Sequence, residues 1–109
     1  MSWENVLPSN LVPIKDVKED EVERAGRFAV EEHNSSGGHH FVYKRVVNGL
    51  YGPIISWDRR YFIIVIEAIN DHGFHWSYIA KVKRFRTWPP LNNHGLLSFE
   101  EVIEFPVPK

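Results

Sequence analysis

Histidines are the residues of this 109-residue chain whose spacing most suggests chemistry. His72 and His75 are spaced like a metal-ligating pair and His39 and His40 are adjacent, but no third ligand lies close in sequence to either pair. We therefore interpret both pairs as solvent-exposed histidines, and we expect no metal and no cofactor. A nucleophile–base arrangement, a phosphate loop and a dinucleotide fingerprint are also missing from the sequence. We expect no catalytic residues and a protein that is not an enzyme.

Basic residues near the predicted strands suggest a second kind of chemistry. With their aromatic neighbours they could form a stripe of the type that binds single-stranded nucleic acid. The formal net charge of -1 and an acidic predicted helix argue against this, so we interpret the stripe as a solvated strand face and expect no nucleic-acid partner. The residues concerned are Arg59, Arg60, Lys81, Lys83, Arg84 and Arg86.

The length and composition predict a single domain spanning residues 1–109. The chain has no cysteine, which excludes disulfides and thiol catalysis but leaves the compartment open. No apolar run approaches transmembrane length, so no membrane partner is expected. Met1-Ser2-Trp3 does not begin a secretory signal, yet the chain could equally be a mature secreted fragment with a new start methionine. Localisation is therefore unassigned.

One amphipathic helix is predicted, running roughly from Glu19 to Ser35 and closed by Gly37-Gly38. Asp16 or Asp20 is expected to cap its N-terminus. Its predicted buried face consists of small residues, which would let a sheet approach closely and curl around the helix. That face contains Val22, Ala25, Gly26, Ala29 and Val30.

Short β-prone runs surround the helix in the sequence. The central one is apolar on both faces, so Tyr61, Ile63 and Val65 need a cover, for which a partner is one candidate. Polar or proline-rich stretches, Ser56–Arg60 and Thr87–Gly95, are predicted as connecting loops. The predicted strands are Val12–Ile14, His40–Val47, Tyr61–Ile69, Phe74–Arg86 and Leu96–Phe105.

Asn48-Gly49 allows two interpretations. It is the strongest hairpin dipeptide in the chain, and the residues alone favour a turn there. Gly49 is also a suitable bulge residue in a strand that would continue to about Ile55. The predicted fold is α+β, with one helix packed on a curved four- to five-stranded antiparallel sheet, a flexible N-terminal trunk over residues 1–11 and a tail over residues 106–109.

The predicted helix carries a motif that resembles one of the plant cystatins. Its matching residues are Gly26, Arg27, Phe28, Ala29, Val30, Glu32, His33 and Asn34, while Ala25 replaces the usual aliphatic residue. The preceding VPIKDVKEDEV is also similar to the lead-in of that family, and the resemblance covers about Val12 to Phe99. It implies a cystatin-like fold that inhibits papain-like cysteine proteases without covalent chemistry, by inserting a wedge into the protease cleft. The wedge would consist of the N-terminal trunk and two hairpin loops. The resemblance also implies a bulged strand that continues through Asn48-Gly49 to about Ile55, and we favour the bulge for this reason.

Each part of the implied wedge departs from the family pattern. Ser9-Asn10-Leu11 stands where the trunk has glycine, and Gly52-Pro53-Ile54-Ile55-Ser56 lacks the glutamine and the closing glycine of the first hairpin. Trp57-Asp58-Arg59 resembles an insertion, and in the second hairpin the prolines follow Trp88. We expect weakened or altered activity on papain-like proteases, or a target in another protease class. The expected partner-binding residues are Asn10, Leu11, Pro53, Ile54, Ile55, Ser56, Trp57, Trp88 and Pro89.

Two questions stay open at this point. Trp3, Trp57 and Trp88 fall in the three wedge segments and could form binding hot spots, or they could fold back on the sheet or lie in a tail. The chain could also be a non-inhibitory binding module with a cystatin fold. In either case it could be a monomer, a homodimer or a domain-swapped dimer.

Overall fold

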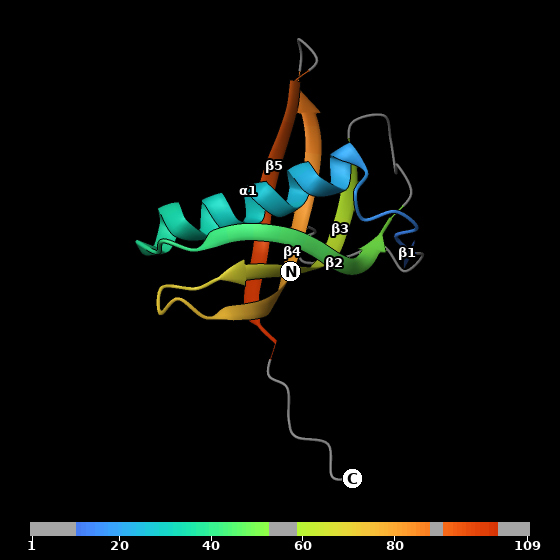
Figure 1. Ribbon diagram of the computed structural model, residues 1–109. Coiled ribbons are helices and arrows are strands. Elements are labelled where there is room, and N and C mark those ends of the chain that lie inside the picture. Colours follow the sequence, from blue (N-terminus) through green and yellow to red (C-terminus); the bar gives the residue numbers. More distant parts are fainter. Residues whose placement is uncertain (1–10, 53–58, 88–90, 103–109) are drawn as a thin grey trace, which may run out of the picture.

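In the computed structural model, the described residues are 11–52, 59–87 and 91–102. They form one helix and a five-stranded antiparallel sheet with strand order β1-β2-β3-β4-β5. Figure 1 shows the helix lying across one face of the curved sheet, where it contacts β2, β3, β4 and β5. The elements are β1 (Val12–Pro13), α1 (Asp20–Gly37), β2 (Val42–Tyr51), β3 (Arg59–Ile69), β4 (His75–Thr87) and β5 (Leu91–Glu101). The predicted α+β fold class is confirmed.

The small-residue face of α1 packs against the sheet as predicted, with all five of its predicted residues buried. At Gly26 the helix backbone lies close to side chains of β2. A Cβ atom at this position would lie 2.7 Å from Val46 Cγ2 and 2.9 Å from Tyr43 Cε1. The missing side chain therefore sets the distance between the helix and β2, since any larger residue would push the two elements apart.

The helix begins without the predicted aspartate cap. Glu19 occupies the N-cap position and makes no side-chain capping bond, while Asp16 Oδ1 accepts a hydrogen bond from the Lys18 N–H at 2.9 Å. The Asp16 carboxylate thus serves the turn before the helix, and the prediction of a cap at Asp16 or Asp20 is wrong. At the other end Gly38 adopts the left-handed conformation at φ 66°, which fits the predicted stop at Gly37-Gly38.

The core lies between α1 and the inner faces of β3 and β4. Phe62, Ile64 and Ile66 of β3 are fully buried, as are Ala80 and Val82 of β4. Apolar and polar residues alternate in the sequence from Phe74 to Arg86, which predicts one buried face. Of that face Tyr78, Ala80 and Val82 are buried, whereas Phe74 and Trp76 are exposed.

The outer face of β3 is covered only in part. Tyr61 is already buried within the chain, whereas Ile63 and Val65 are half-buried. The expected need for a cover therefore applies to the second half of this face and not to Tyr61.

Strand β2 runs on through Asn48-Gly49, as the bulge interpretation requires. The register shifts between Tyr43 and Arg45 and again between Val46 and Asn48, which places the irregularities before Gly49. Gly49 has another role, because a Cβ atom there would lie 2.5 Å from the Ile63 carbonyl oxygen. β2 ends at Tyr51, and the predicted extension to Ile55 falls outside the described residues apart from Gly52.

Two predicted loops are shorter than expected. Arg59 and Arg60 pair with Phe85 and Arg84, so they belong to β3 and not to the tip of the first hairpin or to an insertion. β5 begins at Leu91, which pairs with Thr87, although the sequence LNNHG is typical of a loop. The long partner strand β4 supplies the pairing that the local composition does not favour. β5 ends at Glu101, and residues 103–109 lie outside the described part.

The basic residues do not form one solvated stripe. Arg84 is buried at 5% exposure, and Arg60, its pairing partner on β3, has a side chain only 17% exposed. Lys81, by contrast, is exposed. The interpretation of a single exposed strand face is wrong for these two arginines. Across the described ranges, no helix combines the length and apolar character needed to span a membrane.

Candidate functional site: one end of the sheet

The strand register places the attachment points of the three segments of the predicted wedge at the same end of the sheet. The trunk enters beside the end of β2, where Val12 pairs with Tyr51. Residues 53–58 connect β2 to β3 at that end, and residues 88–90 connect β4 to β5. Since Arg59 pairs with Phe85 and Thr87 pairs with Leu91, the two connections start from adjoining strands within a few residues of each other.

The base of the first connection is held by hydrogen bonds on both sides. The Gly52 N–H donates to the Tyr61 carbonyl at 3.0 Å, and Arg60 Nε donates to the Gly52 carbonyl at 2.8 Å. The Arg60 guanidinium also lies 3.9 Å from the centroid of the Tyr51 ring, which is cation–π geometry. Its Nη1 forms an ion pair with Glu21 in the first turn of α1. These contacts tie two strands and the helix together beside the connection.

Only one of the nine predicted partner-binding residues is described. Leu11 is half-buried and directly precedes β1. The other eight lie outside the described residues: Asn10, Pro53, Ile54, Ile55, Ser56, Trp57, Trp88 and Pro89. Trp3 and Asp58, the latter in the apparent insertion, also lie outside them. The described structure therefore shows where these segments are attached and leaves their binding role as a prediction.

The helix motif serves the fold. The Arg27 guanidinium lies over the Tyr43 ring at 4.8 Å, and Phe28 stacks on His94 at 5.2 Å between ring centroids. Asn34 bonds to the Phe41 backbone in both directions. Each of these motif side chains contacts a strand or the chain leading into one, so the motif contributes to the packing of α1 on the sheet.

A histidine cluster closes the opposite end of the helix. His33 stacks on His39 at 4.5 Å and on Phe99 at 4.1 Å between ring centroids. His39 Nδ1 lies 2.6 Å from Asp71 Oδ2, and the His40 N–H donates to Asp71 Oδ1 at 2.6 Å. His39 is therefore packed and bonded although its side chain is still 37% exposed, and the adjacent His40 is exposed as predicted.

The ionisation of this cluster follows from its contacts. Burial lowers the pKa of His33 below its ordinary value, and the neighbouring His39 lowers it further. The hydrogen bonds from His39 and from the His40 N–H lower the pKa of Asp71. At the hairpin end of the sheet, burial also lowers the pKa of His94, with smaller contributions from Arg84 and Arg24.

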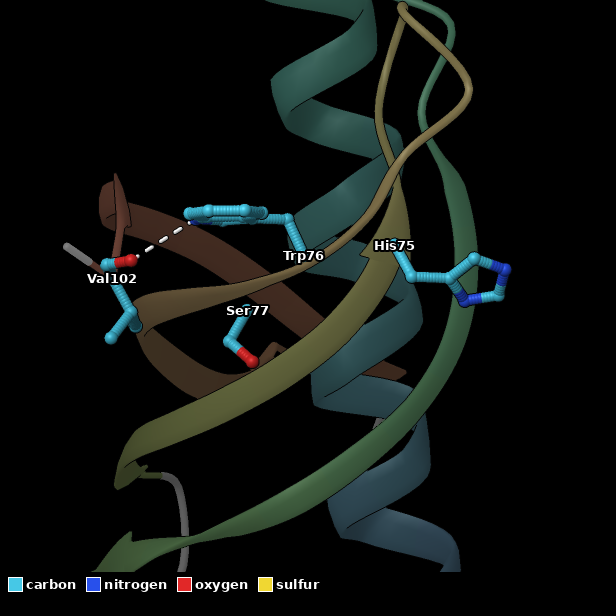
Figure 2. A pocket seen from close by; sticks show the side chains of 4 residues that line it. All are labelled: His75, Trp76, Ser77 and Val102. Atoms are coloured by element: carbon cyan, nitrogen blue, oxygen red, sulfur yellow. Dashed lines mark hydrogen bonds between the residues drawn. The ribbon is translucent and has the colours of Figure 1, made fainter. Parts of the chain in front are cut away.

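A shallow pocket of about 180 Å³ lies far from the hairpin end (Figure 2). It is lined by His75, Trp76, Ser77 and Val102, and the Trp76 indole N–H donates to the Val102 carbonyl at 3.0 Å. The figure shows the His75 ring pointing away from Trp76. None of the nine predicted partner-binding residues lines this pocket. In the described part of the chain, no three histidine or acidic side chains are grouped as metal ligands.

One helix packed across a five-stranded antiparallel sheet is consistent with a cystatin-like fold. A family model described as SQAPI, aspartic acid proteinase inhibitor, matches residues 14–102. The chain belongs to this family of proteinase inhibitors. The finding supports a proteinase inhibitor but gives no support for cysteine proteases as targets, and it does not confirm assignment to the plant cystatins. Comparison with curated proteins gives no match.

Sequence reasoning missed Arg60 and the histidine cluster. Arg60 was placed in a polar loop tip, and no local pattern marks it as a half-buried strand residue. The partners of His33 lie five or more positions away, at His39, Phe41 and Phe99, so helical periodicity alone could not identify them. The family motif contains His33 and Asn34, and it was the available signal that the end of the helix makes specific contacts with the rest of the fold.

Proposed function

We propose that this protein inhibits an aspartic proteinase by non-covalent occupation of the proteinase cleft. The contact surface would comprise the N-terminal trunk and the two connections, with Leu11, Ile54, Ile55, Trp57 and Trp88 as apolar contacts. Asn10, Pro53, Ser56 and Pro89 would supply the backbone and rim contacts around them. The protein itself would perform no chemistry and need no cofactor.

The observation that carries this proposal is the common attachment of the three segments. Val12 pairs with Tyr51 and Arg59 pairs with Phe85, so three separate parts of the chain enter and leave one sheet end. A cleft shaped for an extended peptide needs a partner that offers several contacts side by side. Segments held on a rigid sheet lose little conformational entropy on binding, which favours tight inhibition.

Two observations support an aspartic proteinase as the target. The family is described as inhibiting aspartic proteinases, and this chain lacks the glutamine and glycine that the cystatin resemblance implies for papain-like targets. Aspartic proteinases cleave with two carboxyl groups that share a proton in a deep cleft. An inhibitor that fills the cleft excludes the substrate and needs no reactive group of its own.

Titration of the purified protein against pepsin and against papain tests the proposal. We expect inhibition of pepsin that is competitive with a peptide substrate, and much weaker or no inhibition of papain. Activity should return on dilution, and the inhibitor should keep its intact mass, because no covalent bond forms. If the folded protein inhibits neither enzyme, the proposal fails, and a search for partners of a non-inhibitory binding module takes its place. Tight inhibition of papain alone would assign the protein to the cysteine-protease class instead.

A further inference from the structure

The contacts of the Arg60 side chain join its own strand, β3, to the end of β2 and to α1. Arg60 Nε donates to the carbonyl of Gly52, the last described residue before the first connection, at 2.8 Å. Its guanidinium lies over the Tyr51 ring of β2 and pairs with Glu21 of α1. The guanidinium can make all these contacts at once because it is planar, with donors in a fixed fork and a flat face for the ring.

Because Arg60 is largely buried, the loss of any one of its hydrogen-bond or ion-pair partners would destabilise the folded protein. Its side chain is only 17% exposed, and the Glu21 side chain is 31% exposed. A half-buried guanidinium that lost one partner would retain a desolvated charge without its full set of hydrogen bonds. An exposed ion pair does not carry this desolvation cost. Arg24 and Asp20 form such a pair, with side chains 58% and 80% exposed.

We propose that Arg60 is a positioning residue for inhibition. It fixes the Gly52 carbonyl, the Tyr51 ring and the first turn of α1 relative to one another before any proteinase is bound. The connection that begins after Gly52 is then presented from a base that does not have to become ordered on binding. This inference rests on the proposed function, since it assigns to Arg60 the preorganisation of one of the three proposed contact segments.

The geometry also predicts which substitutions distinguish the positioning effect of Arg60 from the effect of its positive charge. Arg60→Lys keeps the positive charge but replaces the fork with a single ammonium group, which cannot bond to Gly52 and Glu21 while lying flat on Tyr51. Glu21→Gln keeps the Arg60 contacts to Gly52 and Tyr51 and removes the charge that anchors the guanidinium to the helix. Arg24→Gln is the matched control, because it removes one positive charge from the same part of α1 at an exposed pair.

Two measurements on the full chain test the proposal. The first is the inhibition constant against pepsin at one fixed pH. The second is the rate of amide hydrogen exchange of Gly52 in the free protein, relative to the rate for the buried Ile64. The Gly52 N–H is hydrogen-bonded to the Tyr61 carbonyl. We expect Arg60→Gln and Arg60→Lys to weaken inhibition by about tenfold and to speed Gly52 exchange by a similar factor. Glu21→Gln should have a smaller effect in the same direction, and Arg24→Gln should change neither quantity.

The outcomes distinguish this inference from the proposed function. If the parent protein does not inhibit pepsin, both the proposed function and the role of Arg60 in affinity are overturned. The amide exchange of Gly52 then still decides whether Arg60 orders the base of the connection. A parent that inhibits while both Arg60 variants inhibit equally well overturns the inference and leaves the function standing. Full rescue by lysine would also overturn it, since charge alone would then suffice. If Arg60→Gln does not fold, Glu21→Gln and Arg60→Lys carry the test.

Discussion

The side-chain amide of Asn34 and the backbone of Phe41 exchange two hydrogen bonds. Asn34 Nδ2 donates to the Phe41 carbonyl, and the Phe41 N–H donates to Asn34 Oδ1, each at 2.9 Å. This amide imitates a strand partner, because it satisfies both backbone groups of Phe41 just before β2 begins. The last turns of α1 are thereby fixed to the chain that leads into the sheet.

Asn34→Ala should therefore destabilise the protein by about 1–3 kcal/mol, since it leaves two part-buried backbone groups without their partners. Denaturant unfolding measures this change in the free energy of unfolding. Ser35→Ala is the control, because Ser35 is exposed and adjacent to Asn34 in the same turn. A loss equal to that of the control would show that water replaces the Asn34 bonds at no cost.

Gly26→Ala should destabilise by about 1–3 kcal/mol through overpacking, although alanine is the better helix former. The added Cβ would meet Val46 and Tyr43 at distances below 3.0 Å. Thermal or denaturant unfolding measures the effect, and the cost should be smaller in a Val46→Ala background, where part of the space is free. Gly95→Ala is a useful control, because its nearest contact would be an ordinary 3.6 Å. Stabilisation by Gly26→Ala would mean that helix propensity outweighs packing at this site.

Two histidines should make stability depend on pH in a defined direction. The pKa values of His94 and His33 are lowered in the folded protein from 6.5, chiefly by burial. The unfolded chain therefore binds protons more readily than the folded one below pH 6.5, and the free energy of unfolding should fall as pH drops through that value. His94→Gln should reduce this slope. Urea unfolding at a series of pH values gives the slopes for the parent and the variant, and equal slopes for the two proteins would contradict the assignment.

Asp71 should act in the same direction at lower pH. Its pKa is lowered from 3.8 by hydrogen bonds from His39 and the His40 N–H, so its ionised form stabilises the folded state above that value. This stabilisation should be lost as pH falls through the folded-state pKa. Asp71→Asn should lower stability at neutral pH and flatten the acid limb of the stability curve. NMR titration of the Asp71 carboxyl carbon measures the pKa itself, and a value at or above 3.8 would be inconsistent with this account.

The strongest sequence signals predicted the scaffold well. The periodicity of residues 19–35 and the glycines after them identified α1 nearly to its ends, because a helix face and its stop are local patterns. The apolar alternation from Phe74 to Val82 indicates one face of β4, of which Tyr78, Ala80 and Val82 are buried and Phe74 and Trp76 are exposed. The bulge in β2 is an expectation from the family resemblance, and its location before Gly49 depends on pairing with β3.

What the sequence could not predict depends on partners distant in the chain. The stretch after Leu91 forms a strand because β4 extends to Thr87 and offers it backbone partners, while its own composition favours a loop. Arg60 is half-buried because Glu21, 39 positions earlier, lies beside it. Such contacts leave no mark in the local sequence, so an arginine of this kind is indistinguishable from one in a solvated turn.

The location of the inhibitory surface is the central claim, and one comparison of variants tests it most directly. The inhibition constant against pepsin should be measured for the parent, for Ile54→Ser/Ile55→Ser at the hairpin end, and for Phe74→Ser/Trp76→Ser at the opposite end. Phe74 and Trp76 are exposed, so the second variant removes apolar surface away from the proposed contacts. We predict that the first variant loses inhibition by about tenfold or more and that the second retains it. Loss of inhibition in the second variant alone would contradict the account and place the inhibitory surface at the other end of the sheet.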